Sequence, residues 1–300
     1  MLPERIVKRI IGNLPKKVTI VVYSSNAMLE FIKKIATLSN SIEYEFVSDV
    51  EKTTSLPAIG FKNTQIFFHT IPKHLELEAF LNTIRMISEI ERPKSLDVEV
   101  ITFVSNFCPN CRSVVEALNR VALKMGAKHH IIDISLYPEV AKKASVESVP
   151  TIFIGKMIFR GPIDELDAER WIRAEVEKDY YEYIVYKLEK GEIDDLKSIT
   201  SEVETIAELI AHRSFLVRLG AMALLEEIHK KEGKINKRAK EEIIRLLEHE
   251  DERIREDAAM MLGIVGEKED ISILESMLKD AKIAESAREA IENIKMRYGG

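Results

Sequence analysis

Two consecutive stretches of this chain carry the same order of strand-like and helix-like segments. In the first, strand-like runs at residues 18–23 and 44–47 flank a helical run at residues 28–38, and two more strands and a helix follow. The second stretch begins with an apolar strand at residues 98–104 and repeats that order. The spacing of apolar residues supports this interpretation, because strands and amphipathic helices bury their side chains with different periods. We therefore expect an internal repeat of a whole α/β domain.

The two copies differ at the start of their first helix, where the chain carries its only two cysteines. At a shift of eighty residues, Cys108 falls on Met28 and Cys111 falls on Phe31. A structural zinc site normally needs four ligands, and no second cysteine pair or nearby histidine pair completes one, so we expect no bound metal. The loop between the two cysteines is too short to make them an effective structural staple. The remaining interpretation of the cysteine pair is redox chemistry. The alternative is that two unreactive cysteines lie close together by chance.

The last part of the chain, from about residue 191, has a helical pattern throughout. Val217 and Arg218 recur as Ile254 and Arg255, and a weaker third copy follows. Paired helices that repeat every thirty to forty residues are typical of an α-solenoid. The predicted fold is therefore α/β followed by all-α. Its three expected domains span residues 1–92, 93–190 and 191–300.

The composition excludes several classes of partner. The net charge of −6 gives no basic surface for nucleic acid or for an anionic membrane. No run of eighteen apolar residues is present, so no transmembrane helix is predicted. The first residues lack the apolar core of a secretory signal. We therefore expect a cytoplasmic protein, in a compartment where thiols are normally held reduced.

The cysteines stand in the pattern Cys108-Pro109-Asn110-Cys111, after a predicted strand and at the start of a predicted helix. That junction makes the pattern far more specific than the spacing alone. The first turn of a helix favours a thiolate, which is the species that attacks a disulfide. We expect Cys108 to be the exposed nucleophile and Cys111 to be the resolving cysteine. Phe107, directly before the pair, is expected to contact the substrate.

Residues 98–166 resemble a thioredoxin or glutaredoxin domain, because the Cys108 motif is followed by Val149-Pro150 before a strand. In that fold a cis proline lies against the active-site cysteines. The resemblance implies that Pro150 shapes the substrate groove and keeps metals off the dithiol. It also implies that Val149 offers its backbone N–H and C=O to a docked peptide, as in strand addition.

The pair of copies over residues 1–188 is similar to the archaeal and bacterial protein disulfide oxidoreductases, which are tandem thioredoxin folds. Members of that group commonly carry a cysteine pair in both halves, whereas this chain has Met28 and Phe31 in the first. The resemblance thus implies a redox-silent first domain that is structural or docks substrates. Thioredoxins also keep a buried acid on the strand before the motif. Here that position is Thr102, so the proton acceptor for Cys111 stays unassigned.

The helical last third resembles HEAT-like repeats. Such repeats usually offer a curved surface to another protein, and the resemblance implies a protein partner there. Arg218 and Arg255 occupy the same repeat position and are expected to form inter-helix salt bridges rather than ligand contacts.

The function expected from the sequence is thiol–disulfide exchange with protein substrates. The chain has no G-x-G-x-x-G dinucleotide fingerprint, so no cofactor is predicted and an external donor of the thioredoxin-reductase type is implied. The pattern does not say whether the protein reduces, oxidises or isomerises disulfides. A redox sensor or a non-catalytic interaction adaptor is the alternative. Peroxide reduction would need a peroxidatic cysteine for which the sequence has no candidate.

Overall fold

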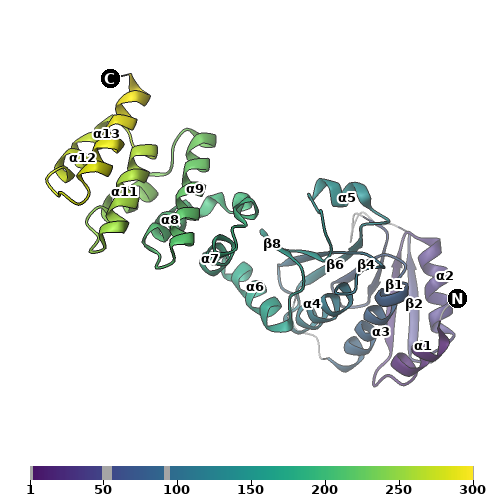
Figure 1. Cartoon of the computed structure of the whole chain (residues 1–300). Coiled ribbons are helices and arrows are strands. Elements are labelled where there is room, and N and C mark those ends of the chain that lie inside the picture. The colour runs from purple at the N-terminus through teal and green to yellow at the C-terminus, as the bar shows by residue number, and fades with distance from the viewer. Residues whose placement is uncertain (1–2, 49–55, 91–94, 300) are drawn as a thin grey trace. The chain divides into compact units, whose positions relative to one another are not determined.

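The computed structural model describes residues 3–48, 56–90 and 95–299 (Figure 1). The chain forms two compact units, residues 1–178 and residues 179–300. The predicted boundary between residues 92 and 93 lies outside the described residues. Among the described residues, every helix is too short or too polar to cross a lipid bilayer.

The first half of the first unit contains three helices and four strands. Their bounds are α1 (Glu4–Ile11), β1 (Val18–Tyr23), α2 (Asn26–Ala36), β2 (Ile42–Val47), β3 (Ala58–Phe61), β4 (Ile66–His69) and α3 (His74–Glu89). β1 is buried over most of its length, and Ile20 and Val22 are fully buried, as expected of a strand in a packed sheet. Ser25 caps α2, because its side chain accepts a hydrogen bond from the backbone N–H of Met28.

The second half contains the dithiol motif. Its elements are β5 (Glu99–Val104), α4 (Cys111–Met125), β6 (Lys128–Asp133), α5 (Pro138–Lys143), β7 (Thr151–Ile154), β8 (Met157–Arg160) and α6 (Glu165–Glu177). α4 ends at Gly126, whose left-handed backbone (φ 84°) suits a residue without a Cβ.

The eight strands form one continuous sheet in the order β2-β1-β3-β4-β6-β5-β7-β8. The same pairing pattern occurs twice: β1 pairs with β2 in parallel and with β3 antiparallel, and β5 does the same with β6 and β7. The parallel pairing of β4 with β6 joins the two halves. The backbone ladder therefore runs without a break between them.

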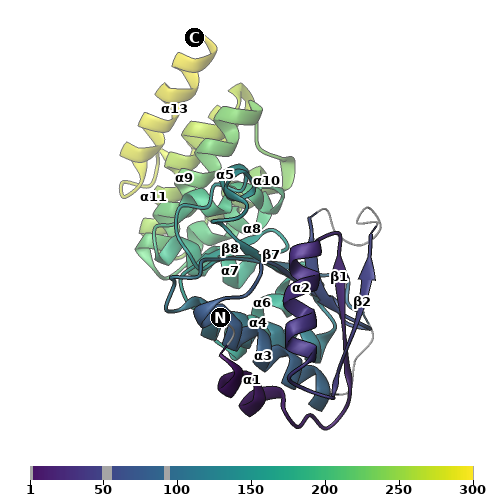
Figure 2. The same ribbon diagram turned by 90° about the vertical axis from the view of Figure 1, so that its right-hand side faces the viewer.

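The helices α1, α3, α4 and α6 lie in a row, each beside the next (Figure 2). α3 packs along α4, so the last helix of the first half covers the dithiol half. The main apolar core accordingly draws on both halves, with Phe80 and Ile84 from α3 beside Val115 and Leu123 from α4. The two halves share buried apolar surface and not only strand hydrogen bonds.

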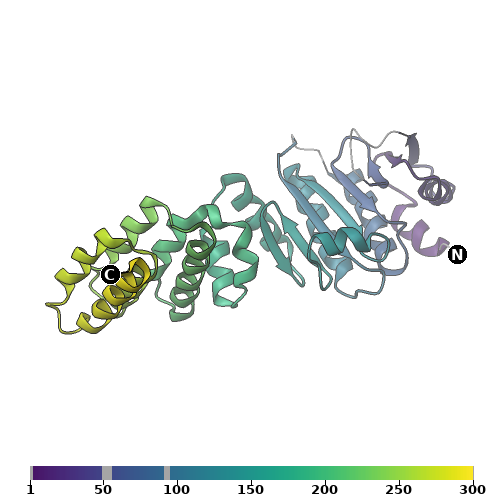
Figure 3. The ribbon, with the colours of Figure 1, turned by 90° about the horizontal axis from the view of Figure 1, so that it is seen from above.

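The second unit is helical throughout its described residues. Its elements are α7 (Tyr181–Glu189), η1 (Ile193–Ser198), η2 (Thr200–Glu202), α8 (Val203–Glu208), η3 (Leu209–Ala211), α9 (Phe215–Glu232), α10 (Lys237–Leu246), α11 (Glu252–Val265), η4 (Lys268–Asp270), α12 (Ile271–Met277) and α13 (Ala284–Tyr298). Consecutive helices pack side by side in pairs (Figure 3).

The two repeated arginines link successive helix pairs, as expected. Arg218 donates from Nε to Asp257 Oδ2 at 2.8 Å, and Arg255 lies 3.3 Å from Asp280 Oδ2. Each also donates to a backbone carbonyl of the preceding turn, at His212 and His249 respectively. A guanidinium group that is hydrogen-bonded to both neighbouring repeats fixes the position of one repeat relative to the next.

Candidate redox site

Cys108 and Cys111 are joined by a disulfide, with their Cα atoms 5.4 Å apart. Cys108 retains 7% of its exposure and Cys111 only 2%. Cys108 is thus more buried than the sequence analysis expected, but it is the more accessible of the two sulfur-bearing residues. The difference in access favours Cys108 as the attacking group.

The helix that carries the motif begins later than expected. α4 starts at Cys111, and Pro109 and Asn110 form a turn before it. The N–H of Cys111 donates to the carbonyl of Cys108 at 3.4 Å, which closes that turn. Cys108 therefore lies one turn ahead of the helix rather than within its first turn. It still faces the helix's N-terminal end, where unpaired N–H groups favour negative charge.

The Val149-Pro150 loop lies against the dithiol. The peptide bond between these two residues is cis, and the carbonyl oxygen of Val149 is 3.7 Å from Cys108 Sγ. Among the described residues, no backbone acceptor pairs with the N–H of Val149. An extended peptide laid beside this loop would therefore find both a donor and an acceptor on the same residue.

Phe107 stands at the rim of the site. It is 85% exposed, the largest exposure among the large hydrophobic residues of the described chain. Its ring stacks on that of His74, with the centroids 6.5 Å apart and the planes 29° apart. Such an exposed ring is available to a substrate. The five site residues expected from the sequence thus lie together.

One group that the sequence analysis missed lies behind the dithiol. Glu76 comes from α3 in the first half, and its side chain is 6% exposed. It shares with Cys111 a small cavity of about 10 Å³, which is room for about one water molecule. The other residues that line this cavity are Phe68, Ala79, Val104, Arg112, Val115 and Ile131.

The Glu76 carboxyl is poorly satisfied in this apolar setting. Thr70 Oγ1 donates to its Oε2 at 3.2 Å, and its Oε1 has no partner among the described residues. Burial raises the pKa of Glu76 to about 8, and the nearby carboxylate of Asp133 adds to the increase. A carboxyl with this pKa can both accept and return a proton near neutral pH.

One feature of the sequence could have indicated that Glu76 is a buried functional residue. Glu76 falls on the same helical face as Phe80, Ile84 and Ile87, a stripe that is otherwise apolar and faces the core. An acid in such a stripe is rarely buried without a function. The position on β5 where thioredoxins keep their acid is Thr102, and its hydroxyl is 2.7 Å from His129 Nε2.

Three histidines, two of them buried, lie at the junction of the two halves. His69 Nε2 and His130 Nδ1 are 2.8 Å apart across β4 and β6, and His129 Nδ1 is 2.6 Å from Asn119 Oδ1. Burial lowers the pKa of His69 and of His130 to about 4, and that of His129 to about 3. These rings are neutral at pH 7 and act as hydrogen-bonding parts of the core. In the described part of the chain, no three ligand-type side chains gather as a metal site would require.

Family models match a region in each of the two units. A family model described as a thioredoxin domain matches residues 96–173, and one described as HEAT repeats matches residues 203–295. No curated protein matches the sequence.

Three solved structures have the fold of the first unit. A mutant of the alkylhydroperoxide reductase protein AhpF from Enterococcus faecalis is 23% identical with a TM-score of 0.51, over 56% of this chain and 95% of that one. The NTD_N/C domain of the same protein is 22% identical with a TM-score of 0.51, over 57% and 99%. A protein disulfide oxidoreductase from Aeropyrum pernix is 18% identical with a TM-score of 0.51, over 58% and 92%.

The resemblance seen in the sequence is thereby confirmed at the level of fold. The thioredoxin match contains the motif from Cys108 to Cys111 and the loop at Pro150, and the HEAT match contains the helices that carry Arg218 and Arg255. The chain thus contains one region that matches a thioredoxin domain and another that matches HEAT repeats.

Proposed function

We propose that the protein is a thiol–disulfide oxidoreductase that exchanges disulfides with protein substrates through Cys108 and Cys111. The observation that carries this proposal is the Cys108–Cys111 disulfide, which lies against the cis Val149-Pro150 bond and behind an exposed Phe107. The Aeropyrum pernix structure of the same fold, which is by name a protein disulfide oxidoreductase, supports the same chemistry.

The exchange follows from the positions of the two sulfurs. In the reduced protein the Cys108 thiolate attacks one sulfur of a substrate disulfide, which forms a mixed disulfide and releases the first substrate thiolate. The Cys111 thiolate then attacks Cys108 Sγ, forms the intramolecular disulfide and releases the second substrate thiolate. Two electrons pass from the dithiol to the substrate. The reverse sequence oxidises a substrate dithiol.

Glu76 supplies the proton acceptor that the second attack requires. Cys111 must lose its thiol proton before it attacks, and the Glu76 carboxylate shares its small cavity. With a pKa of about 8, Glu76 is close to an ordinary thiol pKa of about 8.5, so proton transfer between them costs little free energy.

Substrate backbone is expected to pair with the N–H and C=O of Val149, while Pro150 shapes the groove and Phe107 contacts the chain beside the substrate disulfide. We propose that residues 1–92 and 93–190 are two tandem thioredoxin folds, the first redox-silent. The repeated strand pairing and the alignment of Met28 and Phe31 with the two cysteines support this division.

The remaining parts of the proposal concern partners and compartment. The HEAT-like repeats, as an α-solenoid over residues 191–300, would recruit a protein partner. An external donor of the thioredoxin-reductase type would reduce the disulfide, and the proposed compartment is the cytoplasm.

The test is reduction of insulin by dithiothreitol, run with the wild-type protein and with Cys108→Ser. The wild type is expected to accelerate precipitation of the insulin B chain, whereas Cys108→Ser should give the uncatalysed rate. Equal rates for both proteins would contradict the proposal and favour an adaptor without catalysis. The reduction potential of the pair then fixes the direction, since about −270 mV suits a reductant and a value above about −180 mV suits an oxidant or isomerase.

A further inference from the structure

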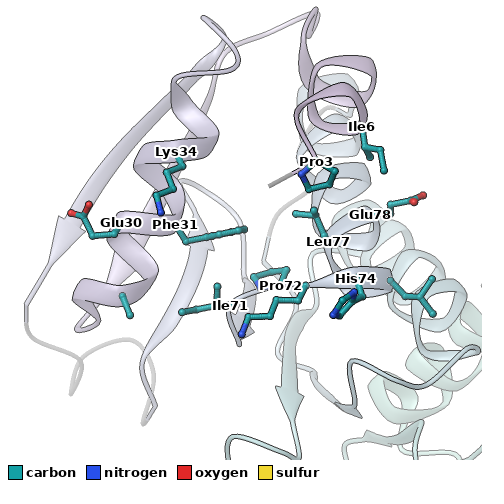
Figure 4. A pocket seen from close by; sticks show the side chains of 13 residues that line it. Pro3, Ile6, Glu30, Phe31, Lys34, Ile71, Pro72, His74, Leu77 and Glu78 are labelled. Carbon is teal, nitrogen blue, oxygen red and sulfur yellow. The ribbon is translucent and has the colours of Figure 1, made fainter. Parts of the chain in front are cut away.

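The first half contains a large open pocket that the proposed exchange mechanism does not use. Its volume is about 760 Å³, within the range of pockets that hold drug-sized ligands. Figure 4 shows it between α2, which contributes Phe31 and Lys34, and the facing segments that contribute Pro3, Ile71 and Leu77. Most of its lining is apolar, and it opens to solvent.

The pocket occupies in the first half the place that the dithiol cavity has in the second. Both lie beside the helix that follows the first strand, and Phe31 lines the pocket at the position that aligns with Cys111. In the second half the preceding helix, α3, has sixteen residues and packs along α4, which leaves a cavity of about 10 Å³. In the first half the preceding helix, α1, has eight residues and packs against α3 instead. The space beside α2 therefore stays open.

The pocket is connected to the dithiol through His74. His74 lines the pocket, and its ring stacks on Phe107, the neighbour of Cys108. Its backbone lies in the left-handed region (φ 49°), which is strained for a residue with a Cβ. A chain that runs from the pocket across His74 and Phe107 would arrive at Cys108.

The charges around the pocket select its occupant. Glu30 is paired with Lys33 at 2.7 Å, and Glu78 is paired with Arg112. Lys34 and Lys73, which also line the pocket, have no carboxylate within ion-pair distance among the described residues. Lys34 is attracted only at longer range by Glu30, and Lys73 by Glu76. An apolar hollow with two ammonium groups outside any short ion pair favours an apolar side chain next to a carboxylate.

We propose that this pocket docks a segment of the protein substrate that carries a bulky apolar side chain beside an acidic residue. The inference rests on the proposed function, because docking there would hold the substrate's disulfide near Cys108. The redox-silent half thus selects substrates by an apolar, acidic segment some distance from the cysteine in their sequence. Anchoring of this kind raises the effective concentration of the disulfide at the dithiol.

Two synthetic peptides test the proposal. Each carries the same internal disulfide; one adds the segment Glu-Phe-Leu-Glu through a Gly-Ser linker of several lengths, and the other adds only Gly-Ser. The measured quantity is the second-order rate constant with which each peptide oxidises the full-length, pre-reduced protein. The anchored peptide is expected to react about tenfold faster at the best linker length, which corresponds to about 1.4 kcal/mol of docking.

Three variants test whether the difference between the two rate constants arises at the pocket. Ala27→Trp fills the pocket from α2, and Lys34→Glu reverses an exposed charge in its lining. Both should bring the ratio of the two rate constants close to one. Lys16→Glu makes the same charge change at an exposed lysine outside the pocket and should leave the ratio as in wild type. An unchanged ratio in Ala27→Trp would overturn the proposal.

A binding measurement separates this inference from the proposed function. A fluorescent Glu-Phe-Leu-Glu peptide without cysteine is titrated with the oxidised protein and followed by anisotropy. Saturable binding that Ala27→Trp abolishes supports the pocket even if neither disulfide peptide is reduced, in which case the proposed function alone fails. No binding of the peptide, or binding of dodecanoate without any binding of the peptide, contradicts the docking proposal.

Discussion

The two halves of the sheet have the same strand pairing and differ in the helix that precedes their first strand. In the dithiol half this helix is α3, which packs along α4 and directs Glu76 toward Cys111. In the first half it is the shorter α1, which leaves a pocket beside Phe31. Because α3 belongs to the first half in sequence, one copy supplies the buried acid of the other. A half without cysteines thus contributes a carboxyl to the cavity beside the dithiol.

Removal of the resolving cysteine should have the largest effect. Cys111→Ser is expected to abolish turnover of a disulfide peptide and to accumulate the mixed disulfide at Cys108, since the second attack has lost its nucleophile. Mass spectrometry under non-reducing conditions measures the adduct. Phe31→Leu, at the aligned position of the first half, is the matched control and should turn over a disulfide peptide that lacks the docking segment at the wild-type rate. Loss of turnover in Phe31→Leu would mean that the first half takes part in exchange.

Removal of the buried acid should have the next largest effect. Glu76→Gln keeps the shape of the side chain but cannot accept a proton, so resolution of the mixed disulfide at pH 7 should slow by about 10²-fold. Stopped-flow measurements of a single turnover report this step. The difference should shrink above about pH 9, where the Cys111 thiol ionises without help. Glu89→Gln, on the same helix but paired with Arg85 and outside both cavities, is the control. Equal rates for wild type and Glu76→Gln would remove Glu76 from the mechanism.

Glu76 should also make the free energy of unfolding depend on pH. The pKa of Glu76 is raised to about 8, above its unfolded value of about 4.3, so the folded state binds more protons between these values. Stability is therefore lost as the pH rises from about 4.3 to about 8. Glu76→Gln should be more stable than wild type at about pH 8 by a few kcal/mol, and the advantage should vanish toward about pH 4.5. Urea unfolding of the oxidised proteins measures it, and an advantage that is constant with pH would contradict the assigned cause.

The smallest expected effect is the change in unfolding free energy when the residue at the start of α2 or of α4 is replaced. Ser25 caps α2 through the N–H of Met28, whereas the side chain of Asn110 makes no capping bond at the start of α4. Ser25→Ala should cost about 1 kcal/mol of unfolding free energy, and Asn110→Ala should cost much less. Denaturant unfolding decides between them. A larger loss in Asn110→Ala would show that the turn before α4 depends on that side chain.

Much of the site could be predicted from local sequence, because its parts lie close together along the chain. The motif at Cys108 follows its strand and precedes its helix within a dozen residues, and Val149-Pro150 precedes a strand directly. The predicted start of α4 was about one turn too early. The turn at Pro109 depends on backbone geometry that residue types do not specify. Glu76 was not predicted because it approaches Cys111 only through packing of α3 on α4, a contact between segments 35 positions apart.

The continuous sheet was also beyond the reach of the sequence patterns. The sequence pattern of each half predicts enough strands for a separate sheet. Nothing in β4 or β6 alone indicates that these two strands pair with each other. Two separate sheets and one joined sheet bury similar patterns of residues in each strand. The junction is visible only once the strands are placed in space.

The pairing of β4 with β6 has a consequence for any deletion of the first half. If residues 1–92 were deleted, β6 would present an unpaired edge to other chains and α4 would lose the helix that covers it. The dithiol half would also lose its buried carboxyl. The strand junction and the carboxyl therefore make the first half a part of the dithiol half's own structure and not a separable module.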